Sequence, residues 1–216
     1  MIDFFTGLTL TVLPLYAKFV LKMEESMVGF AAIGIALGTL ISIPFWRTIY
    51  AKKGAKYGLL LAFGIFILGI WPISLVVDFL TFFVLTLIPG FGVGGLIMTE
   101  PAMSAAIDYD EIRTGKRREA TFTGVLAFVA RLSMVFSGFT LIIVGLLTGF
   151  DSSAAVQTEK TLIGLRTLVS LVPLLGALIG FLIFSKFSLN YEAFMEQQAK
   201  LKTLHEERLK KLETIK

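Results

Sequence analysis

The chain has 216 residues, of which 56% are hydrophobic and 17% are charged, and its formal net charge is +4. A soluble domain usually carries about a quarter charged residues. This composition therefore excludes a disordered chain, a disulfide-rich secreted scaffold and an ordinary soluble enzyme. Because the sequence has no cysteine and one histidine, it offers no metal cluster and no nucleophile–base pair. We expect a membrane protein that is not an enzyme and that holds no metal and no cofactor.

Six apolar stretches predict six transmembrane helices and an all-α, polytopic fold. Each stretch is long enough to cross a hydrocarbon core of about 30 Å as a helix, and the alternating strands of a membrane barrel are missing. The stretches are residues 4–21, 27–46, 57–77, 79–99, 122–150 and 162–187. The first has no basic start and no small-residue cleavage site, so we predict a retained helix rather than a signal peptide.

The basic residues predict how the chain is oriented. Lys and Arg number 15 on the side that holds residues 47–56, residues 108–119 and everything from residue 186, against 4 on the opposite side. The positive-inside rule makes the first side cytoplasmic, with both termini there, and it explains the basic excess without a nucleic-acid partner. We expect a multi-pass protein of the plasma membrane. Three aromatic residues are expected at the membrane interfaces: Trp46, Tyr57 and Trp71.

Two units follow from the change in composition along the chain. Residues 1–187 form the predicted six-helix transmembrane domain, and residues 188–216 form a charged cytoplasmic tail with helical spacing of its apolar residues. All six prolines lie inside or at the rim of an apolar stretch, where proline removes a backbone hydrogen bond and bends a helix. We predict helix hinges at Pro89, Gly90 and Pro173, with close helix packing as the alternative for the glycine-rich run after Pro89.

Arg131 is the most informative charge because it lies inside the fifth apolar stretch. A guanidinium at this depth costs at least about 2.5–3.5 kcal/mol. Its helical neighbours include Gly124, Ala127 and Gly138, so its face is partly small. We predict that this face turns to the bundle interior or to a water-filled cavity on a substrate or ion pathway. Glu100, near the cytoplasmic end of the fourth stretch, is the expected carboxylate partner.

The connection between the fourth and fifth stretches carries a recognisable pattern. Ile107-Asp108-Tyr109-Asp110-Glu111 is followed by Thr114-Gly115-Lys116-Arg117-Arg118-Glu119 and then by Arg131. By itself this pattern indicates a solvated loop that neutralises its own charge. It resembles the loop between the tenth and eleventh helices of the glycoside–pentoside–hexuronide:cation symporters, the melibiose-permease-like branch of the major facilitator superfamily. Lys53-Gly54-Ala55-Lys56 resembles the loop between their eighth and ninth helices.

This resemblance covers the whole membrane portion as a carboxyl-terminal half-bundle. It implies uptake of a sugar or related small solute, coupled to Na⁺ or H⁺, by alternating access. Arg131 takes the place of a family lysine close to the sugar and cation sites. Asp108, Arg117 and Glu119 match residues that close the cytoplasmic gate by charge pairing. The chain departs from the family at Ala105, where a second acid is common, and at Arg131, since arginine does not readily give up a proton.

A six-helix half offers one wall of a transport cavity, because such transporters bind substrate between two halves. The resemblance therefore implies a second half, which is a separately encoded amino-terminal half-transporter, a second copy of the chain or the remainder of a truncated gene. The alternative is a non-transporting membrane remnant or interaction subunit derived from such a transporter. The sequence does not indicate the substrate or the coupling ion.

Overall fold

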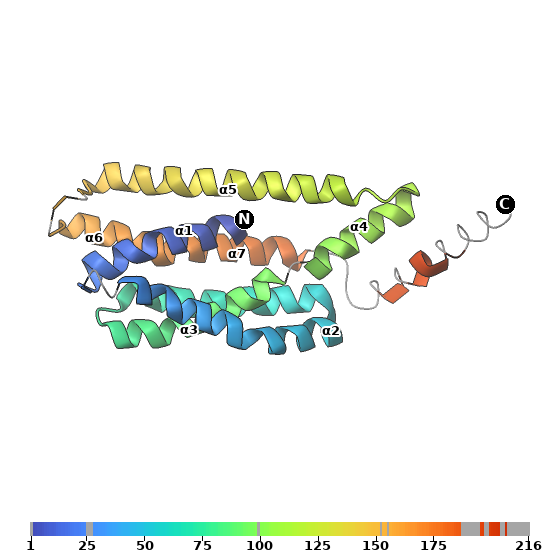
Figure 1. Ribbon diagram of the computed structural model, residues 1–216, viewed down its shortest axis with the longest axis horizontal. Helices are drawn as coiled ribbons and strands as arrows, with labels where there is room; N and C mark the ends of the chain where they lie inside the picture. Colours follow the sequence, from blue (N-terminus) through green and yellow to red (C-terminus); the bar gives the residue numbers. More distant parts are fainter. Residues whose placement is uncertain are drawn as a thin grey trace.

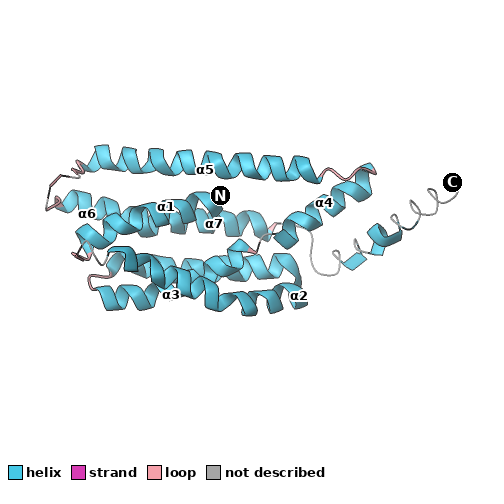
Figure 2. Cartoon of the chain, viewed as in Figure 1, coloured by secondary structure: helices cyan, strands magenta, loops and turns pink. Residues whose placement is uncertain are grey.

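The structure is a computed structural model, and it describes residues 2–24, 28–98, 100–151, 153–154, 156–186, 195–196, 199–203 and 206. For residues 2, 3, 5, 6, 100 and 101 it describes the backbone alone. The described part is helical and contains no strand (Figure 1, Figure 2). The α-helices are α1 (Ile2–Leu15), α2 (Ile33–Ile70), α3 (Phe79–Ile97), α4 (Glu100–Thr114), α5 (Glu119–Thr148), α6 (Glu159–Arg166) and α7 (Val172–Ser185). Short π-helical segments follow α1 (Tyr16–Val20) and α6 (Thr167–Leu171), and 3-10 turns flank α2 (Val28–Ala32 and Trp71–Leu75).

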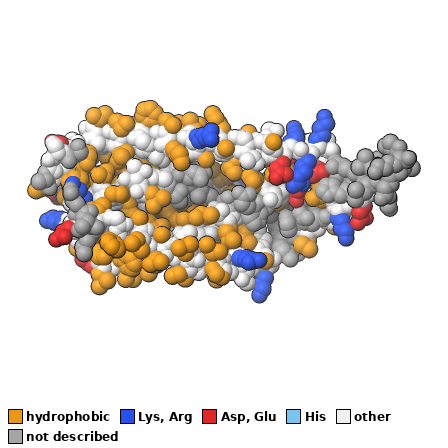
Figure 3. Space-filling model, in the orientation of Figure 1, with side chains coloured by type: hydrophobic (Ala, Val, Ile, Leu, Met, Phe, Trp, Pro, Cys, Tyr) orange, Lys and Arg blue, Asp and Glu red, His pale blue; other side chains and the backbone are white. Residues whose placement is uncertain are grey.

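Within the part of the chain that the structure describes, four helical runs are long and apolar enough to cross a membrane: Val28–Leu75, Phe79–Thr114, Glu119–Thr148 and Glu159–Ser185. A shorter apolar helix, Gly7–Val20, lies in the first predicted stretch. Figure 3 shows a broad band of hydrophobic side chains, with acidic side chains toward the two ends of the molecule and a few isolated basic side chains along the band. The all-α membrane architecture is thus confirmed, whereas the count of six transmembrane helices stays a prediction.

The run Val28–Leu75 reverses direction in its middle. A straight helix of 48 residues would measure about 72 Å, far more than one bilayer core. Gly54 breaks it with φ 79° and ψ 171°, a conformation that glycine adopts without steric cost. A Cβ at Gly58 would lie 2.9 Å from the Tyr50 ring. In a straight helix these two residues would be about 12 Å apart, so the chain folds back on itself between them. Figure 1 shows the two arms of α2, residues 33–53 and 55–70, running back along each other.

The core of the bundle is α3 packed against both arms of α2. Glycines of α3 allow this approach, because a Cβ at Gly92 would lie 2.7 Å from the Phe66 backbone nitrogen. The side chain of Trp46 is fully buried here, and its Nε1 donates a hydrogen bond to the Phe91 carbonyl at 2.7 Å. The prediction of Trp46 as an interface residue was therefore wrong, since the α3 glycines leave room for the indole beside it.

The carboxyl end of α2 lies far from the Gly54 reversal and continues into the 3-10 turn Trp71–Leu75. Side chains from the segment after α1 and from the α6 region bind the backbone carbonyls there. The buried Tyr16 hydroxyl lies 2.8 Å from the Ile73 carbonyl oxygen and 3.0 Å from that of Val76. Arg166 Nη1 donates to the Ser74 carbonyl, and Ser170 Oγ donates to the Trp71 carbonyl at 3.1 Å. The last carbonyls of a helix have no partner within the helix and carry its negative dipole end. These donors satisfy them and join α1, α2 and α6 at one end of the bundle.

Helix α5 lies along one side of the bundle (Figure 1) and packs loosely against it. Only 11% of its most apolar window is buried, against 44% in Val28–Leu75 and 39% in Glu159–Ser185. Its buried residues are Ser133 and Ser137, and the Ser137 hydroxyl lies 3.1 Å from the Phe4 carbonyl oxygen. Small polar residues thus face the bundle, and most of the large apolar side chains of α5 face away from it.

Candidate functional site

Arg131 lies on the outward side of α5. It is exposed, and it follows the first residue of α5 by 12 positions, or about 18 Å along the helix. A Cβ at Gly124 or Gly138, on the same side of the helix, would meet nothing within 4 Å. Of the two predicted alternatives, the interior of this bundle is therefore excluded for Arg131, and a water-filled cavity stays a prediction. The reason is that the two small serines, Ser133 and Ser137, provide the closer packing surface and turn toward α1.

The predicted partner of Arg131 is not settled by the structure. Glu100 begins α4, but its side chain lies outside the described residues. Within the part of the chain that is described, Arg131 forms no ion pair. A pairing between Arg131 and Glu100 stays a prediction.

The α4–α5 connection gathers charged side chains around one guanidinium. Arg117 Nη1 lies 3.3 Å from Asp108 Oδ1 and 3.2 Å from Glu111 Oε2, and Arg117 Nε lies 3.1 Å from Glu119 Oε2. The structure thus brings together the three predicted gate residues, Asp108, Arg117 and Glu119. We name the four residues, with Glu111, the Arg117 cluster.

Local backbone chemistry places Arg117 over the last turns of α4. Gly115 has φ 71° and donates its N–H to the Glu111 carbonyl at 2.8 Å. This left-handed cap is the common way to end a helix and turn the chain back. Thr114 Oγ1 lies 2.7 Å from the Asp110 carbonyl oxygen and supports the same turn. The chain therefore returns along α4, and Arg117 reaches the carboxylates of the preceding helix.

Glu111 is the member of this cluster that sequence reasoning missed. Its side chain is only 1% exposed, although glutamate is almost never fully buried without a partner. Asp108 and Glu111 are three residues apart and therefore share one face of α4, so the spacing could have identified it. The hydrogen bonds that Arg117 donates to Glu119 and Glu111 raise the pKa of Arg117 above its ordinary value. The Arg117 guanidinium is therefore charged at every physiological pH.

A second ion pair stabilises the same connection. Arg118 binds Asp110 in a bidentate manner, with Nε 2.9 Å from Oδ2 and Nη2 2.5 Å from Oδ1. The hydrogen bond to Asp110 raises the pKa of Arg118. Both arginines of the connection are thus held by acids of α4, and the connection has a defined geometry rather than the solvated loop that its composition alone indicated.

The predicted hinges lie in well-packed surroundings. Pro89 and Gly90 are buried within α3, and a Cβ at Gly90 would lie 2.9 Å from the Ile35 Cα. Pro173 is buried in the first turn of α7, directly after the π-helical segment Thr167–Leu171. Close packing at Gly90, one of the two alternatives for this run, is what the structure shows. A hinge at Pro89, Gly90 or Pro173 stays a prediction.

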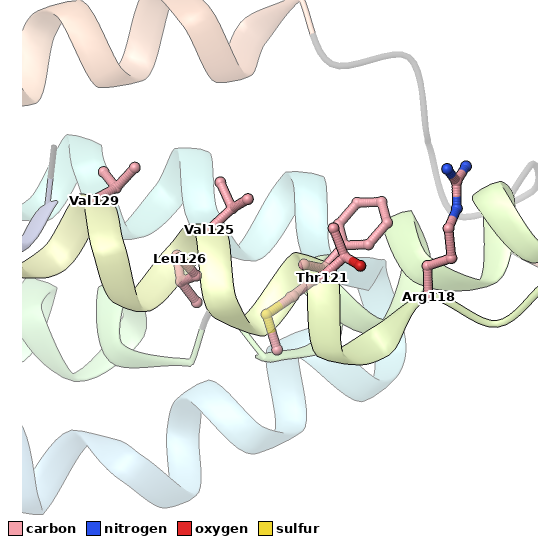
Figure 4. A pocket seen from close by; sticks show the side chains of 7 residues that line it. Arg118, Thr121, Val125, Leu126 and Val129 are labelled. Atoms are coloured by element: carbon pink, nitrogen blue, oxygen red, sulfur yellow. The ribbon is translucent and has the colours of Figure 1, made fainter.

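A cavity of about 490 Å³ lies between α4 and the first half of α5. Arg118 and Thr121 line it near the charged connection, and apolar side chains follow along α5 (Figure 4). The remaining lining residues are Met103, Phe122, Val125, Leu126 and Val129. A sugar needs several hydrogen-bonding groups to orient it, and this lining supplies few of them, so the cavity does not by itself form a sugar site.

The sequence agrees with a family model described as MFS/sugar transport protein over residues 4–191. The chain belongs to this family of sugar transporters. It is also similar to the Bacillus subtilis (strain 168) protein named "Uncharacterized symporter YjmB", with 29% identity over 185 residues. That alignment covers 77% of the chain and 38% of the relative, so the chain spans well under half the length of the curated relative it matches. These findings confirm the resemblance drawn from the pattern between Ile107 and Arg131.

Proposed function

We propose that this chain is one half of a secondary active transporter that carries a sugar or glycoside together with Na⁺ or H⁺. In this proposal the other wall of the transport cavity comes from a second six-helix bundle. That bundle is supplied by a separate chain, by a second copy of this one or by further residues of the same polypeptide. The proposal rests on the family membership and on one structural observation, the outward position of Arg131 on the loosely packed α5.

The position of Arg131 supports a cavity between two halves. In lipid, a guanidinium in the middle of an apolar helix is unfavourable by at least about 2.5–3.5 kcal/mol. Facing a water-filled crevice between two bundles, it keeps its hydration and its charge, and binding sites of such transporters lie at this interface. The planar guanidinium donates several hydrogen bonds in a fixed geometry, which suits the paired hydroxyl groups of a sugar. Because arginine stays protonated, the coupled cation binds elsewhere in the cavity.

The Arg117 cluster supports a gate at the end of the molecule where α4 connects to α5. Arg117 is half exposed, whereas Asp108 and Glu111 are buried. We propose that this end is cytoplasmic, with both termini on that side of the plasma membrane. Charge pairs here then close the cytoplasmic side of the cavity when the two halves approach, and they separate when the halves rock apart.

Uptake measurements test the proposal in cells that lack their own transport of the sugar. We expect radiolabelled glycoside to accumulate in a sodium- or proton-dependent manner when the chain is expressed with its second half. Loss of charge-assisted hydrogen bonds worth about 1.5–3 kcal/mol each predicts that Arg131→Ala lowers uptake at least tenfold at unchanged protein level. Met134→Ala is the matched control, because Met134 is a long exposed side chain on the same helix, and it should transport normally.

Two results would contradict the proposal. Unchanged uptake in both Arg131→Ala and Glu100→Gln, at normal protein levels, would remove Arg131 from the pathway. Absence of uptake by the wild-type chain with each candidate second half, and for every glycoside offered, would favour the alternative of a non-transporting membrane remnant.

A further inference from the structure

The two connections at one end of the bundle differ sharply in their charge balance. The α4–α5 connection, taken with the last turns of α4 as residues 108–119, contains four bases and four acids, and Arg117 and Arg118 form ion pairs with acids of α4. The reversal of α2, residues 47–56, contains four bases and no acid. No acidic residue occurs anywhere between Glu25 and Asp78. The first connection neutralises itself, and the second needs an anion from outside this segment.

The four bases of the reversal lie within ten residues of one another, and we name them the α2 patch: Arg47, Lys52, Lys53 and Lys56. The first three are exposed and the fourth is half-buried. None of them forms an ion pair with a residue that the structure describes. Figure 3 shows basic side chains projecting from this end of the α2 region without acidic side chains beside them. The α2 patch thus presents positive charge that the described residues leave uncompensated.

The position of the α2 patch indicates where its anion lies. Arg47 precedes Gly54 by seven residues, which is about 10 Å along the first arm, and exposed Ile43 and Phe45 come just before it. At the end of the first arm, Lys53 Nζ lies 4.4 Å from the centroid of the exposed Tyr57 ring, which belongs to the second arm. An arginine bordering exposed apolar residues, with lysines beyond it and a tyrosine alongside, is the arrangement of a membrane–water interface.

We propose that the α2 patch binds the headgroup of an anionic phospholipid, with phosphatidylglycerol as the probe. Anionic headgroups lie at the depth where the apolar arms end, and basic residues next to a transmembrane helix attract them. Arg47 donates to the lipid phosphate in a planar, bidentate manner, and Lys52 and Lys53 approach it from the water side. The proposal requires only that the chain spans a membrane, so it stands or falls independently of transport.

Native mass spectrometry of the delipidated full chain in detergent tests this binding directly. Each base near the surface changes anionic-lipid affinity about fivefold. We therefore expect phosphatidylglycerol to bind at least about tenfold more tightly than phosphatidylcholine. The double variant Lys52→Gln/Lys53→Gln should bind phosphatidylglycerol about 25-fold more weakly. The matched control Arg113→Gln/Lys116→Gln removes two exposed bases from the self-neutralised connection and should retain wild-type affinity. Circular dichroism confirms that both variants fold.

Four results would overturn the proposal. Equal affinity for the two lipids would show that the patch does not select charge. Equal weakening in both double variants would show a response to net charge alone. Wild-type affinity in Lys52→Gln/Lys53→Gln would leave an acidic protein surface as the partner of the patch. Displacement of phosphatidylglycerol by inorganic phosphate at equal concentration would assign the site to a soluble anion instead of a lipid.

Discussion

The Glu111 carboxylate lies 3.2 Å from Nη1 of Arg117, although the Glu111 side chain is 1% exposed and the Arg117 side chain is 45% exposed. One ion pair therefore joins the inside of the molecule to water. A buried carboxylate that loses a charged partner is unfavourable by several kcal/mol, whereas an exposed ion pair contributes little. The same pair also connects the end of α4 to the residue that precedes α5 by two positions.

We predict that Arg117→Ala destabilises the chain by about 2 kcal/mol, a value reduced from that of a fully buried pair because Arg117 is half exposed. The loss arises at the buried carboxylate of Glu111, which keeps its desolvation cost. Arg118→Ala, which removes the exposed arginine of the neighbouring pair, should cost clearly less. Urea unfolding in detergent, followed by helical circular dichroism, measures both. Equal losses would contradict a special role for the buried carboxylate.

The Tyr16 hydroxyl allows a second stability prediction, at the carboxyl end of α2. Tyr16→Phe removes the donor shared by the Ile73 and Val76 carbonyls and should cost about 1–2 kcal/mol. Hydrogen exchange should then rise in residues 71–76 and also in residues 166–171, because Arg166 and Ser170 bind the same turn. Tyr50→Phe is the matched control, since its buried hydroxyl donates to the Gly95 carbonyl at 2.9 Å. Exchange confined to residues 71–76 would show that the three donors act separately.

An added methyl group should lower the stability of the protein at a glycine of α3 but not at a glycine of α5. A Cβ at Gly92 would lie 2.7 Å from backbone of the second arm of α2, whereas a Cβ at Gly124 would meet nothing within 4 Å. We predict that Gly92→Ala costs about 1–3 kcal/mol through overpacking and that Gly124→Ala has no cost, because alanine favours helix. Thermal unfolding of the two variants decides the matter. A tolerated Gly92→Ala would mean that α3 and α2 pack less closely than the structure shows.

Asp78 predicts a pH dependence at the start of α3. Its carboxylate accepts a hydrogen bond from the Thr81 N–H at 2.9 Å, and this bond lowers the pKa of Asp78 below its ordinary 3.8. Because the pKa is lowered on folding, the stabilisation is fully present above the unfolded pKa and is lost as pH falls through the folded one. The wild-type urea midpoint should therefore fall as the pH is lowered past the ordinary Asp78 pKa of 3.8.

Two substitutions isolate the contribution of Asp78. Asp78→Asn can still cap the helix and should fall less over the same pH range, because its amide does not titrate. Asp78→Ala should be less stable than wild type at neutral pH, since the first turn of α3 loses its side-chain acceptor. An Asp78→Asn variant with the full wild-type pH dependence would assign that dependence to other carboxylates.

Part of the candidate site could be predicted because the connection resembles that of a known family. The resemblance singled out Asp108, Arg117 and Glu119, and they lie together. Charged residues three or four apart on a helix also share a face. Glu111 satisfies the same spacing rule, yet nothing in the sequence showed that its carboxylate is buried. Burial depends on what covers α4, and contacts between distant segments decide that.

The amino-acid sequence by itself determined the apolar stretches, the basic and acidic connections between them and the membership of a sugar-transport family. Those properties depend on composition and on the order of residues over short stretches of the chain. Only the tertiary structure decided which side of each helix faces inward: Trp46 lies in the core, and Arg131 faces away from it. A helix that is apolar on every side gives no periodic signal of its buried face. The choice between its faces is made by packing, through small residues such as Gly92 and Ser137 that let neighbouring helices come close.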